Sequence, residues 1–291
     1  MHQIFIFILI LLCYRMALWS VESVPAFCIT LERRADRWKR FQDQPGINGL
    51  TLQRFLGVDG KTLDLKNDNR VTTLTKRNIA LKTRRSHEEL DSIGGVGCAL
   101  SHIAMWQWMV DHNEEVCIIF EDDAVVPPTF RSKANECIKG SKILSNPRSW
   151  DMWLLGGQWG NLSRIPGEPI TSGVHRVDAF LLFHAYVLTL HGAKRLLKEV
   201  YPIHCHIDIW TCIYAHFNDF RVVCCNKMIL KQNEKIKTDI QTEKEAAICN
   251  VPTDFEKTSM LVPTMEWRIA QASEVALMGL LLYYAYQRWI K

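Results

Sequence analysis

The chain has 291 residues, of which 48% are hydrophobic and 23% are charged, and its formal net charge is +4. This length and apolar content are typical of a globular protein with a full core, and they exclude a chain that is disordered throughout. The small net charge does not indicate nucleic-acid binding, and the ten cysteines contain no Cys-x-x-Cys pair of the zinc-ribbon or thioredoxin kind.

Residues 3–13 form an apolar run that is shorter than the roughly 20 residues a membrane-spanning helix needs. The run fits a signal peptide or a weak anchor, although no Lys or Arg precedes it. We therefore expect residues 1–24 to direct the chain to the secretory pathway or a membrane, with a docked strand and a cytoplasmic location as alternatives. The sequon Asn161-Leu162-Ser163 matters only on the secretory route.

Residues 25–250 are predicted to form the folded domain, beginning with a strand at residues 25–31. A helix with Trp38 and Phe41 on one face follows this strand. Its basic start can present side chains to a phosphate, and the alternative is an ordinary solvated helix. A second strand is predicted at residues 52–60, where Asp59 is either a ribose ligand or a plain turn residue.

Residues 61–92 are basic and predict a long loop with short helical pieces. The glycine-rich turn at residues 94–97 leads into a core helix that continues to residue 110. This turn is not a P-loop, because no Gly-Lys-Ser/Thr follows it. On this pattern alone, His102 is an ordinary histidine within a helix.

The run from Val116 to Phe120 is continuously apolar, which is typical of a strand buried on both faces in a mostly parallel sheet. Three acids, Glu121, Asp122 and Asp123, follow at its carboxyl end, where ligands bind in open α/β sheets. Carboxylates at this density favour a hard divalent cation such as Mn²⁺ or Mg²⁺. The alternative is an acidic corner exposed to solvent.

The remaining elements are predicted from apolar runs and breaks. They are a helix near 129–144, a strand at 150–157, a flexible loop at 160–173, a strand at 179–189, a helix from 191 and a strand that ends at Gln232. On an extended segment, His204, His206 and Asp208 would share one face, and a zinc site there is a minor alternative. In the tail, 251–291, the apolar residues 275–286 are either a membrane anchor or a docked helix.

Several motifs occur in one order along residues 25 to 240. They are Leu31-Glu32-Arg33-Arg34-Ala35-Asp36-Arg37, Val58-Asp59-Gly60, Gly97-Cys98-Ala99-Leu100-Ser101-His102, Phe120-Glu121-Asp122-Asp123, His184-Ala185-Tyr186, His206-Ile207-Asp208, Gln232 and Thr238-Asp239-Ile240. In these motifs the sequence resembles glycosyltransferase family 25, which includes bacterial lipooligosaccharide galactosyltransferases and procollagen galactosyltransferases. The sequence departs from the family's usual pattern at Thr30, where Asn is common, and at Thr238, where Ser is usual.

The resemblance implies an α/β domain of the GT-A type that binds a nucleotide sugar, with a mixed, mostly parallel sheet flanked by helices. It implies metal-dependent, inverting transfer of galactose or glucose from a UDP-sugar to a hydroxyl of a glycan or glycosylated protein. The acid cluster stands for the metal-binding Asp-x-Asp motif, with Glu121 and Asp123 at the required spacing and Mn²⁺ or Mg²⁺ as the ion. The residues expected to contact the donor are Arg33, Arg34, Arg37, Asp59, Ser101, His102 and Gln232.

An inverting displacement needs a general base for the acceptor hydroxyl. Asp208 is the candidate for this role, and His206 is a weaker one. The expected partners are the donor and a carbohydrate or glycoprotein acceptor, without nucleic acid and with membrane association through an apolar terminus. A metal-dependent phosphoesterase or nuclease and a catalytically inactive carbohydrate-binding relative are the alternatives.

Overall fold

The computed structural model describes residues 19–82, 86, 88–233, 235–236 and 238–240. The apolar run at residues 3–13 and the apolar tail at 275–286 lie outside these residues, so both anchor predictions stay predictions. Within the described part of the chain, the helices are too short or too polar for any of them to cross a membrane.

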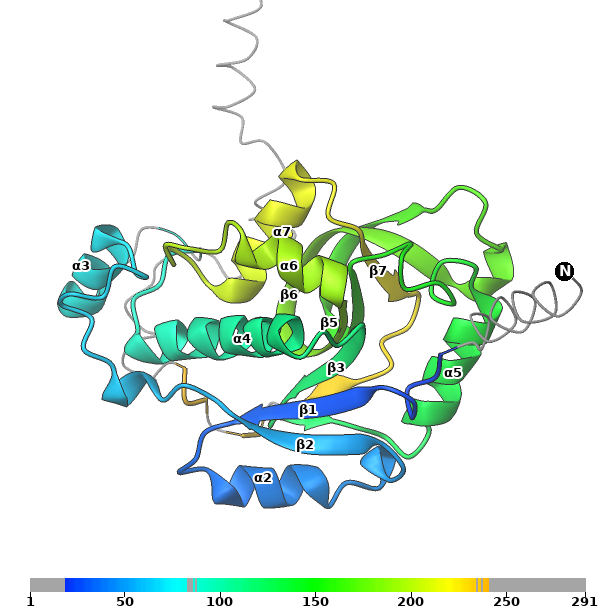
Figure 1. Ribbon diagram of the computed structural model, residues 1–291, viewed down its shortest axis with the longest axis horizontal. Helices are drawn as coiled ribbons and strands as arrows, with labels where there is room; N and C mark the ends of the chain where they lie inside the picture. The colour runs from blue at the N-terminus through cyan, green and yellow to red at the C-terminus, as the bar shows by residue number, and fades with distance from the viewer. Residues whose placement is uncertain (1–18, 83–85, 87, 234, 237, 241–291) are drawn as a thin grey trace, which may run out of the picture. The chain divides into compact units, whose positions relative to one another are not determined.

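A mixed sheet of six strands, in the order β2-β1-β3-β6-β5-β7, forms the centre of the domain (Figure 1). β1 pairs in parallel with β2 and β3, β7 pairs in parallel with β5, and β6 runs antiparallel to β3, β5 and β7. The predicted α/β class with a mixed, mostly parallel sheet is therefore confirmed, and the arrangement is consistent with a GT-A-like fold. The strands are β1 (Pro25–Thr30), β2 (Thr51–Leu56), β3 (Val116–Glu121), β5 (Met152–Arg164), β6 (Val174–Thr189) and β7 (Val222–Cys225).

Helices lie on both sides of the sheet, with α2 and α4 on opposite sides of β1 and β2 (Figure 1). A small second sheet pairs β4 (Ala124–Val125) with β8 (Lys231–Gln232). The helices are α2 (Ala35–Gln42), α3 (Thr73–Leu81), α4 (Ile93–Asp111), α5 (Phe130–Gly140), α6 (Leu190–Leu197) and α7 (Ile207–Phe217), with short 3-10 turns η1 (Pro45–Ile47), η2 (Gly60–Thr62) and η3 (Ile170–Ser172).

Alternate side chains of the central strands pack against these two helical layers. Phe27 of β1 packs on Trp108 of α4, with ring centroids 4.5 Å apart. Phe120 of β3 packs on Phe41 of α2 at 5.4 Å. Burial of each such ring contributes roughly 1.5–3 kcal/mol to stability. Helices thus cover both faces of the sheet, which explains why residues 116–120 are apolar without a break. The acids that follow this run lie at the edge of the core.

The predicted flexible loop at residues 160–173 is wrong in its first part. β5 continues to Arg164 and forms a long antiparallel arm with β6, in which Leu162 pairs with Val177. Gly160 lies within β5, whereas Pro166, Gly167, Pro169 and Gly173 belong to the turn between these strands. Pairing with a partner strand later in the chain has overridden the local turn signal.

The extended segment predicted around His206 is also wrong, because α7 begins at Ile207 and His206 is its N-cap. His204, His206 and Asp208 therefore do not share the face of a strand. Apolar or buried residues recur at Ile207, Trp210 and Tyr214, a spacing that suits a helix. Asp208 lies in the first helical turn, where a negative charge is favourable.

Candidate functional site

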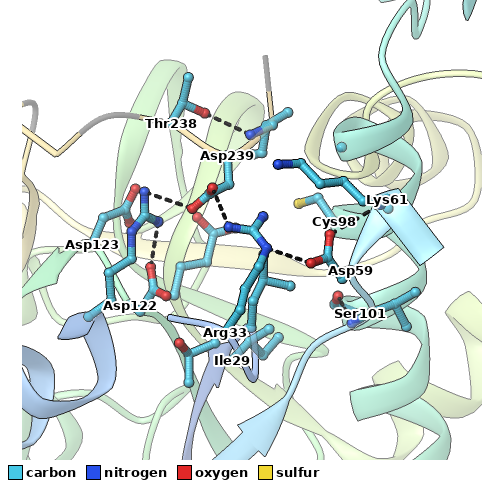
Figure 2. A pocket seen from close by; sticks show the side chains of 18 of the residues that line it. Ile29, Arg33, Asp59, Lys61, Cys98, Ser101, Asp122, Asp123, Thr238 and Asp239 are labelled. Carbon is cyan, nitrogen blue, oxygen red and sulfur yellow. Dashed lines mark hydrogen bonds and ion pairs between the residues drawn. The ribbon is translucent and has the colours of Figure 1, made fainter. Parts of the chain in front are cut away.

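A cavity of about 250 Å³ lies where β1 and β3 end. Figure 2 shows that its walls come from segments far apart in the chain. They are the ends of β1 and β3, the loops that follow β1 and β2, the first turns of α4, and residues 238–240. Of the predicted site residues, the cavity is lined by Arg33, Arg37, Asp59, Ser101, His102, Glu121, Asp122 and Asp123.

The three acids of the cluster have different partners. Glu121 is 3.0 Å from Nε2 of His102, and Asp122 accepts a hydrogen bond from Nη1 of Arg37 at 2.9 Å. Asp123 accepts a hydrogen bond from Nε2 of Gln232 at 2.9 Å. The pairing of β4 with β8 brings Gln232 to this position, across more than a hundred residues of sequence. The structure thus gathers the predicted acids, His102 and Gln232 around one point.

Asp123 keeps one carboxylate oxygen for another partner. Its Oδ1 is buried and has no hydrogen-bond partner among the described residues. Burial, and then the charge of Glu121, raise the pKa of Asp123 to about 7, although the bond from Gln232 lowers it. A buried carboxylate without a partner is costly, and a cation beside it would favour the charged form. The donor set therefore fits a divalent cation at Asp123 and Glu121.

His102 is positioned by a buried chain of hydrogen bonds. Its Nδ1 is 2.8 Å from the hydroxyl of Tyr186, and Trp106 donates its indole N–H to that same hydroxyl at 2.9 Å. Two fixed neighbours, Tyr186 and Glu121, therefore set the orientation of the imidazole ring. Although burial raises the pKa of Glu121, the hydrogen bond and charge of His102 outweigh it, so that the pKa is lowered overall.

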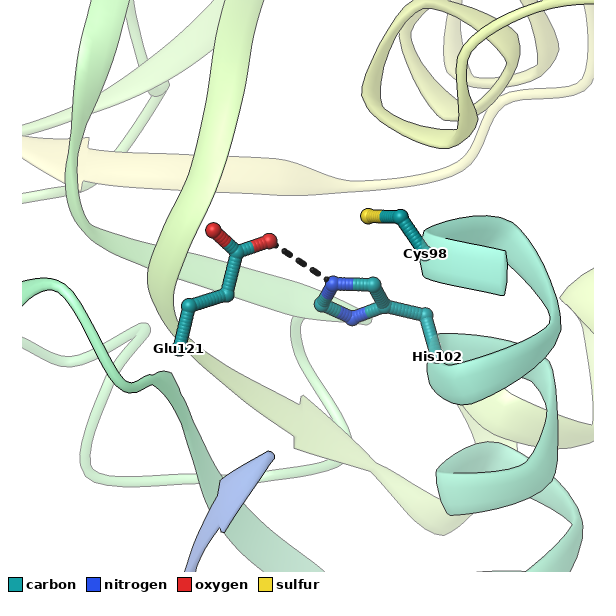
Figure 3. A group of neighbouring side chains, drawn as sticks. All are labelled: Cys98, His102 and Glu121. Atoms are coloured by element: carbon teal, nitrogen blue, oxygen red, sulfur yellow. Dashed lines mark hydrogen bonds and ion pairs between the residues drawn. The ribbon is translucent and has the colours of Figure 1, made fainter. Parts of the chain in front are cut away.

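Cys98 lies one helical turn before His102 and points toward the same space (Figure 3). One ligand atom each from Cys98, His102 and Glu121 lies within 4.8 Å of the others. Burial, followed by the charges of Glu121, Asp208 and Asp123, raises the pKa of Cys98 well above its usual value. Because a thiol binds metals as the thiolate, a metal at Cys98 must first displace this proton. This requirement favours the carboxylates as the primary ligands.

The start of α4 is held against the loop that follows β2. A Cβ atom at Gly97 would lie 2.7 Å from the carbonyl oxygen of Val58, so only glycine permits this approach. One turn later, Ser101 donates to the Gly97 carbonyl at 2.6 Å and accepts from the Val58 N–H at 2.8 Å. Ser101 thus fixes the position of α4, and with it that of His102.

The three predicted phosphate-binding arginines converge on a residue outside the predicted set, Asp239. Arg33 Nη1 and Arg37 Nη2 each lie 3.1 Å from its carboxylate, and Arg34 contacts it as well. In Figure 2, Asp239 lies at the centre of the cavity wall beside Arg33. Arg33 also pairs with Asp59 at 2.5 Å. The structure therefore brings the three arginines together, where each already forms an ion pair with a carboxylate, and their role in donor binding stays a prediction.

Asp208 and His206 are outside the set of cavity-lining residues. Each carboxylate oxygen of Asp208 accepts a backbone N–H, from Leu182 at 2.8 Å and from Ile209 at 2.9 Å. The charge of Asp208 nevertheless acts on Cys98, which lines the cavity. His206 lies beside the first turn of α4, because a Cβ atom at Gly95 would be 3.7 Å from its ring.

The site and its support also include four residues outside the predicted set, which are Cys98, Tyr186, Lys61 and Asp239. Cys98, Tyr186 and Asp239 stand inside the motifs quoted above, so the motifs contained the signal. Lys61 lines the cavity directly after the Asp59-Gly60 turn, and no local pattern distinguishes it from a solvated lysine.

Comparison with known proteins gives one family for this chain. Residues 24–162 match the family model described as glycosyltransferase family 25 (LPS biosynthesis protein). A glycosyltransferase 25 family member of Anopheles gambiae is 30% identical over 175 residues, which are 60% of this chain and 28% of the relative. Procollagen galactosyltransferase 1 of Danio rerio is 26% identical over 173 residues, 59% of this chain and 28% of the relative.

A relative of Bos taurus, named probable inactive glycosyltransferase 25 family member 3, is 26% identical over 181 residues. That match covers 60% of this chain and 28% of the relative. The chain thus spans less than a third of the length of these relatives. The family match includes the arginines, the start of α4 and the acid cluster. The family predicted from the motifs is confirmed by these comparisons, in which residues 24–162 of this chain match glycosyltransferase family 25.

Proposed function

We propose that the chain is a metal-dependent, inverting glycosyltransferase that moves galactose or glucose from a UDP-sugar to a hydroxyl of a glycan or glycosylated protein. The observation that carries this proposal is the position of Glu121, Asp122 and Asp123. They follow the central strand of a family 25 domain and face a cavity that also contains cationic side chains. This combination suits a leaving group with two phosphates.

Glu121 and Asp123 would hold Mn²⁺ or Mg²⁺, while Arg37 keeps Asp122 in an ion pair. The unpartnered, buried oxygen of Asp123 supports this assignment, because oxygen ligands of this kind suit hard cations. When bound, such an ion supplies Lewis-acid neutralisation of the departing diphosphate. The side chain of Gln232 would keep Asp123 oriented toward it through their hydrogen bond.

The donor would lie along the arginines and the loop after β2. Arg33 and Arg37 line the cavity and would bind phosphate oxygens, and Asp59 would accept a ribose hydroxyl. Arg34 lies beside the cavity and would contribute positive charge for the diphosphate, although its guanidinium also contacts Asp239. Ser101 and His102 would shape the wall formed by α4.

Asp208 is the proposed general base, with His206 as the second candidate. The base takes the proton of the acceptor hydroxyl while the oxygen attacks the anomeric carbon on the side opposite the diphosphate. The charge of Asp208 at Cys98 supports a position near the cavity. Its two backbone hydrogen bonds would fix the carboxylate for this task.

We also propose that the protein works in the secretory pathway, because one of its relatives is named a procollagen galactosyltransferase. A second candidate function is that of an inactive family member that keeps the binding site without turnover. The name of the bovine relative favours it, and so do the ion pairs that Asp59, Asp122 and Asp239 already make with the three arginines.

Ligand-dependent thermal stability and donor hydrolysis test the proposal together. We expect UDP-galactose or UDP-glucose to raise the melting temperature in Mn²⁺ and not in EDTA, since a ligand that binds the folded state stabilises it. We expect donor turnover in Mn²⁺ only. Stabilisation without turnover would identify the inactive relative. Full activity in excess EDTA, or no response to any UDP-sugar, would refute the transferase assignment.

The Asp123→Asn variant tests the metal assignment. We expect turnover to fall at least about 10²-fold, because an interaction with the developing charge is lost. The fold should survive, because the buried carboxylate lacks a partner at Oδ1 among the described residues, and an amide is cheaper to bury. Asp111→Asn, at an exposed helix end, is the matched control and should keep full activity. Wild-type turnover in Asp123→Asn would disprove the metal role.

A further inference from the structure

Two cysteines outside the cavity lie side by side, although they belong to different secondary-structure elements. Cys137 lies on α5 and Cys225 ends β7, 88 residues later, and their Sγ atoms are 2.9 Å apart. A disulfide bond is about 2.05 Å long, so the two sulfurs need to approach by less than about 1 Å. Each lies in a secondary-structure element, which keeps the pair together.

The surroundings of the two thiols differ. Cys225 is buried in the apolar cluster that also contains Phe130, Ala134 and Ile138 of α5, and Cys137 is partly exposed at the edge of that cluster. The thiol of Cys225 donates a hydrogen bond to Cys137, and this bond lowers the pKa of Cys137. Cys137 is therefore the sulfur that a small oxidant reaches and that ionises first. Cys224 is fully buried and lies on the other face of β7.

We propose that Cys137 and Cys225 form a disulfide when the folded protein meets a disulfide oxidant such as oxidised glutathione. The Cys137 thiolate attacks one sulfur of the oxidant and releases one glutathione thiolate. Cys225 then loses its proton and attacks the Cys137 sulfur of the mixed disulfide, which releases the second glutathione. The two cysteines lose two electrons and two protons in total, and the oxidant gains them as two thiols.

The disulfide would connect the two segments that flank β4 and β8, the strands whose pairing positions Asp123 and Gln232. α5 follows β4 directly, and Cys225 begins the segment that leads to β8 and Gln232. Between them, the N–H groups of Ile229 and Leu230 both donate to the carbonyl of Leu155. A bond from α5 to the start of this segment would limit its movement away from β4. The inference depends on the position of the thiols and stands independently of the proposed function.

Peptide mapping tests the bond directly. The purified full chain is equilibrated with oxidised and reduced glutathione, its free thiols are alkylated in denaturant, and it is digested with trypsin. Cleavage after Lys133, Lys139, Arg221 and Lys227 gives peptides 134–139 and 222–227. We expect them to be linked in the oxidised protein and separate after reduction. If the two peptides are not linked in the oxidised protein, the proposal is wrong.

Peptide 222–227 contains both Cys224 and Cys225, so a variant identifies the partner. In Cys224→Ala the link should remain, and in Cys225→Ala it should disappear. A link that is lost in Cys224→Ala and kept in Cys225→Ala would also overturn the proposal, because the bond would then belong to the other face of β7.

Thermal stability supplies a second measurement that does not depend on digestion. The disulfide would join residues 88 positions apart and so restrict the unfolded chain. Adding reductant should therefore lower the melting temperature of the oxidised wild type by roughly 5 °C or more. Cys137→Ser replaces the partly exposed member of the pair and should show no response to reductant. An equal response in both proteins, or none in the wild type, would contradict a bond at Cys137.

Discussion

Asp208 has a structural task beside its proposed chemical one. It holds the N–H of Leu182, a residue in β6 whose φ of +71° is unfavourable for a branched side chain. In Asp208→Asn only one of the two backbone N–H groups keeps an acceptor, so we expect a loss of about 1–3 kcal/mol in unfolding free energy. If Asp208 is the base, turnover should also fall by roughly 10² to 10⁴ with little change in donor affinity.

Chemical denaturation, single-turnover rates and UDP-sugar titration separate these effects in Asp208→Asn. Leu182→Gly is the matched control, because glycine adopts a positive φ without strain and leaves the carboxylate in place. If Asp208→Asn is less stable but turns over the donor normally, Asp208 is a structural residue and not the general base. A collapse of donor affinity would instead make it a ligand of the donor or the metal.

Asp239 competes with any phosphate for the same guanidinium groups. Arg33, Arg34 and Arg37 all contact its carboxylate, so its negative charge lowers the positive potential that an incoming phosphate would meet. We therefore expect Asp239→Asn to tighten UDP binding, by about tenfold, in calorimetric titrations with Mn²⁺ present. Weaker binding in this variant would show that Asp239 holds the arginines in place for the donor, which is the opposite role.

At the scale of elements, the approach of residues 238–240 to α4 depends on one glycine. A Cβ atom at Gly94 would lie 2.5 Å from the carbonyl oxygens of both Asp239 and Ile240, so Gly94→Ala must move that segment. We expect the variant to change UDP affinity in the same direction as Asp239→Asn and to keep the melting temperature within a few degrees. In Gly140→Ala, the control at the end of α5, the new Cβ meets nothing within 4 Å. Identical UDP affinity in Gly94→Ala and the wild type would contradict this coupling.

The elements that could be predicted from the sequence are those whose signal is local. The apolar run at 116–120 and the acids after it predicted both the buried strand and the edge at which the cavity lies. The contact of Arg33 with Asp239 joins residues 206 positions apart, and no pattern within either segment specifies it. The start of α7 was not predicted, because polar and apolar residues alternate around His206 as they do in a strand. The helical spacing of apolar residues begins only at Ile207.

At the scale of the whole molecule, the end of the sheet opposite the cavity is held together by a buried carboxylate. Asp151 precedes β5 and is fully buried. It accepts hydrogen bonds from Nε of Arg221 and Nη1 of Arg195, each at 3.1 Å, and lies 2.7 Å from Nδ1 of His191. It thereby connects β5, α6 and the start of β7. Burial raises the pKa of Asp151, but the bonds from Arg221 and His191 outweigh it, so that the pKa is lowered overall.

This lowered pKa predicts how stability depends on pH. A carboxyl group whose pKa is lower in the folded state stabilises the protein above its unfolded value of about 3.9, and this contribution is lost as the pH falls through the folded value. Asp151→Asn should therefore cost about 1.5–3 kcal/mol in urea unfolding near neutral pH, because the buried carboxylate loses the charge that strengthens its hydrogen bonds with Arg221 and Arg195. Its stability should also decline less steeply than that of the wild type below about pH 4.

Asp219→Asn is the matched control for Asp151→Asn, because Asp219 pairs with Arg176 at 3.3 Å while its side chain is 83% exposed. An exposed pair contributes less than about 1 kcal/mol, so this variant should unfold almost as the wild type does at every pH. Donor turnover well below the melting temperature should be unchanged in both variants, since neither residue lines the cavity. If Asp151→Asn and Asp219→Asn lost equal stability near neutral pH, the buried carboxylate would not be what holds this end of the sheet.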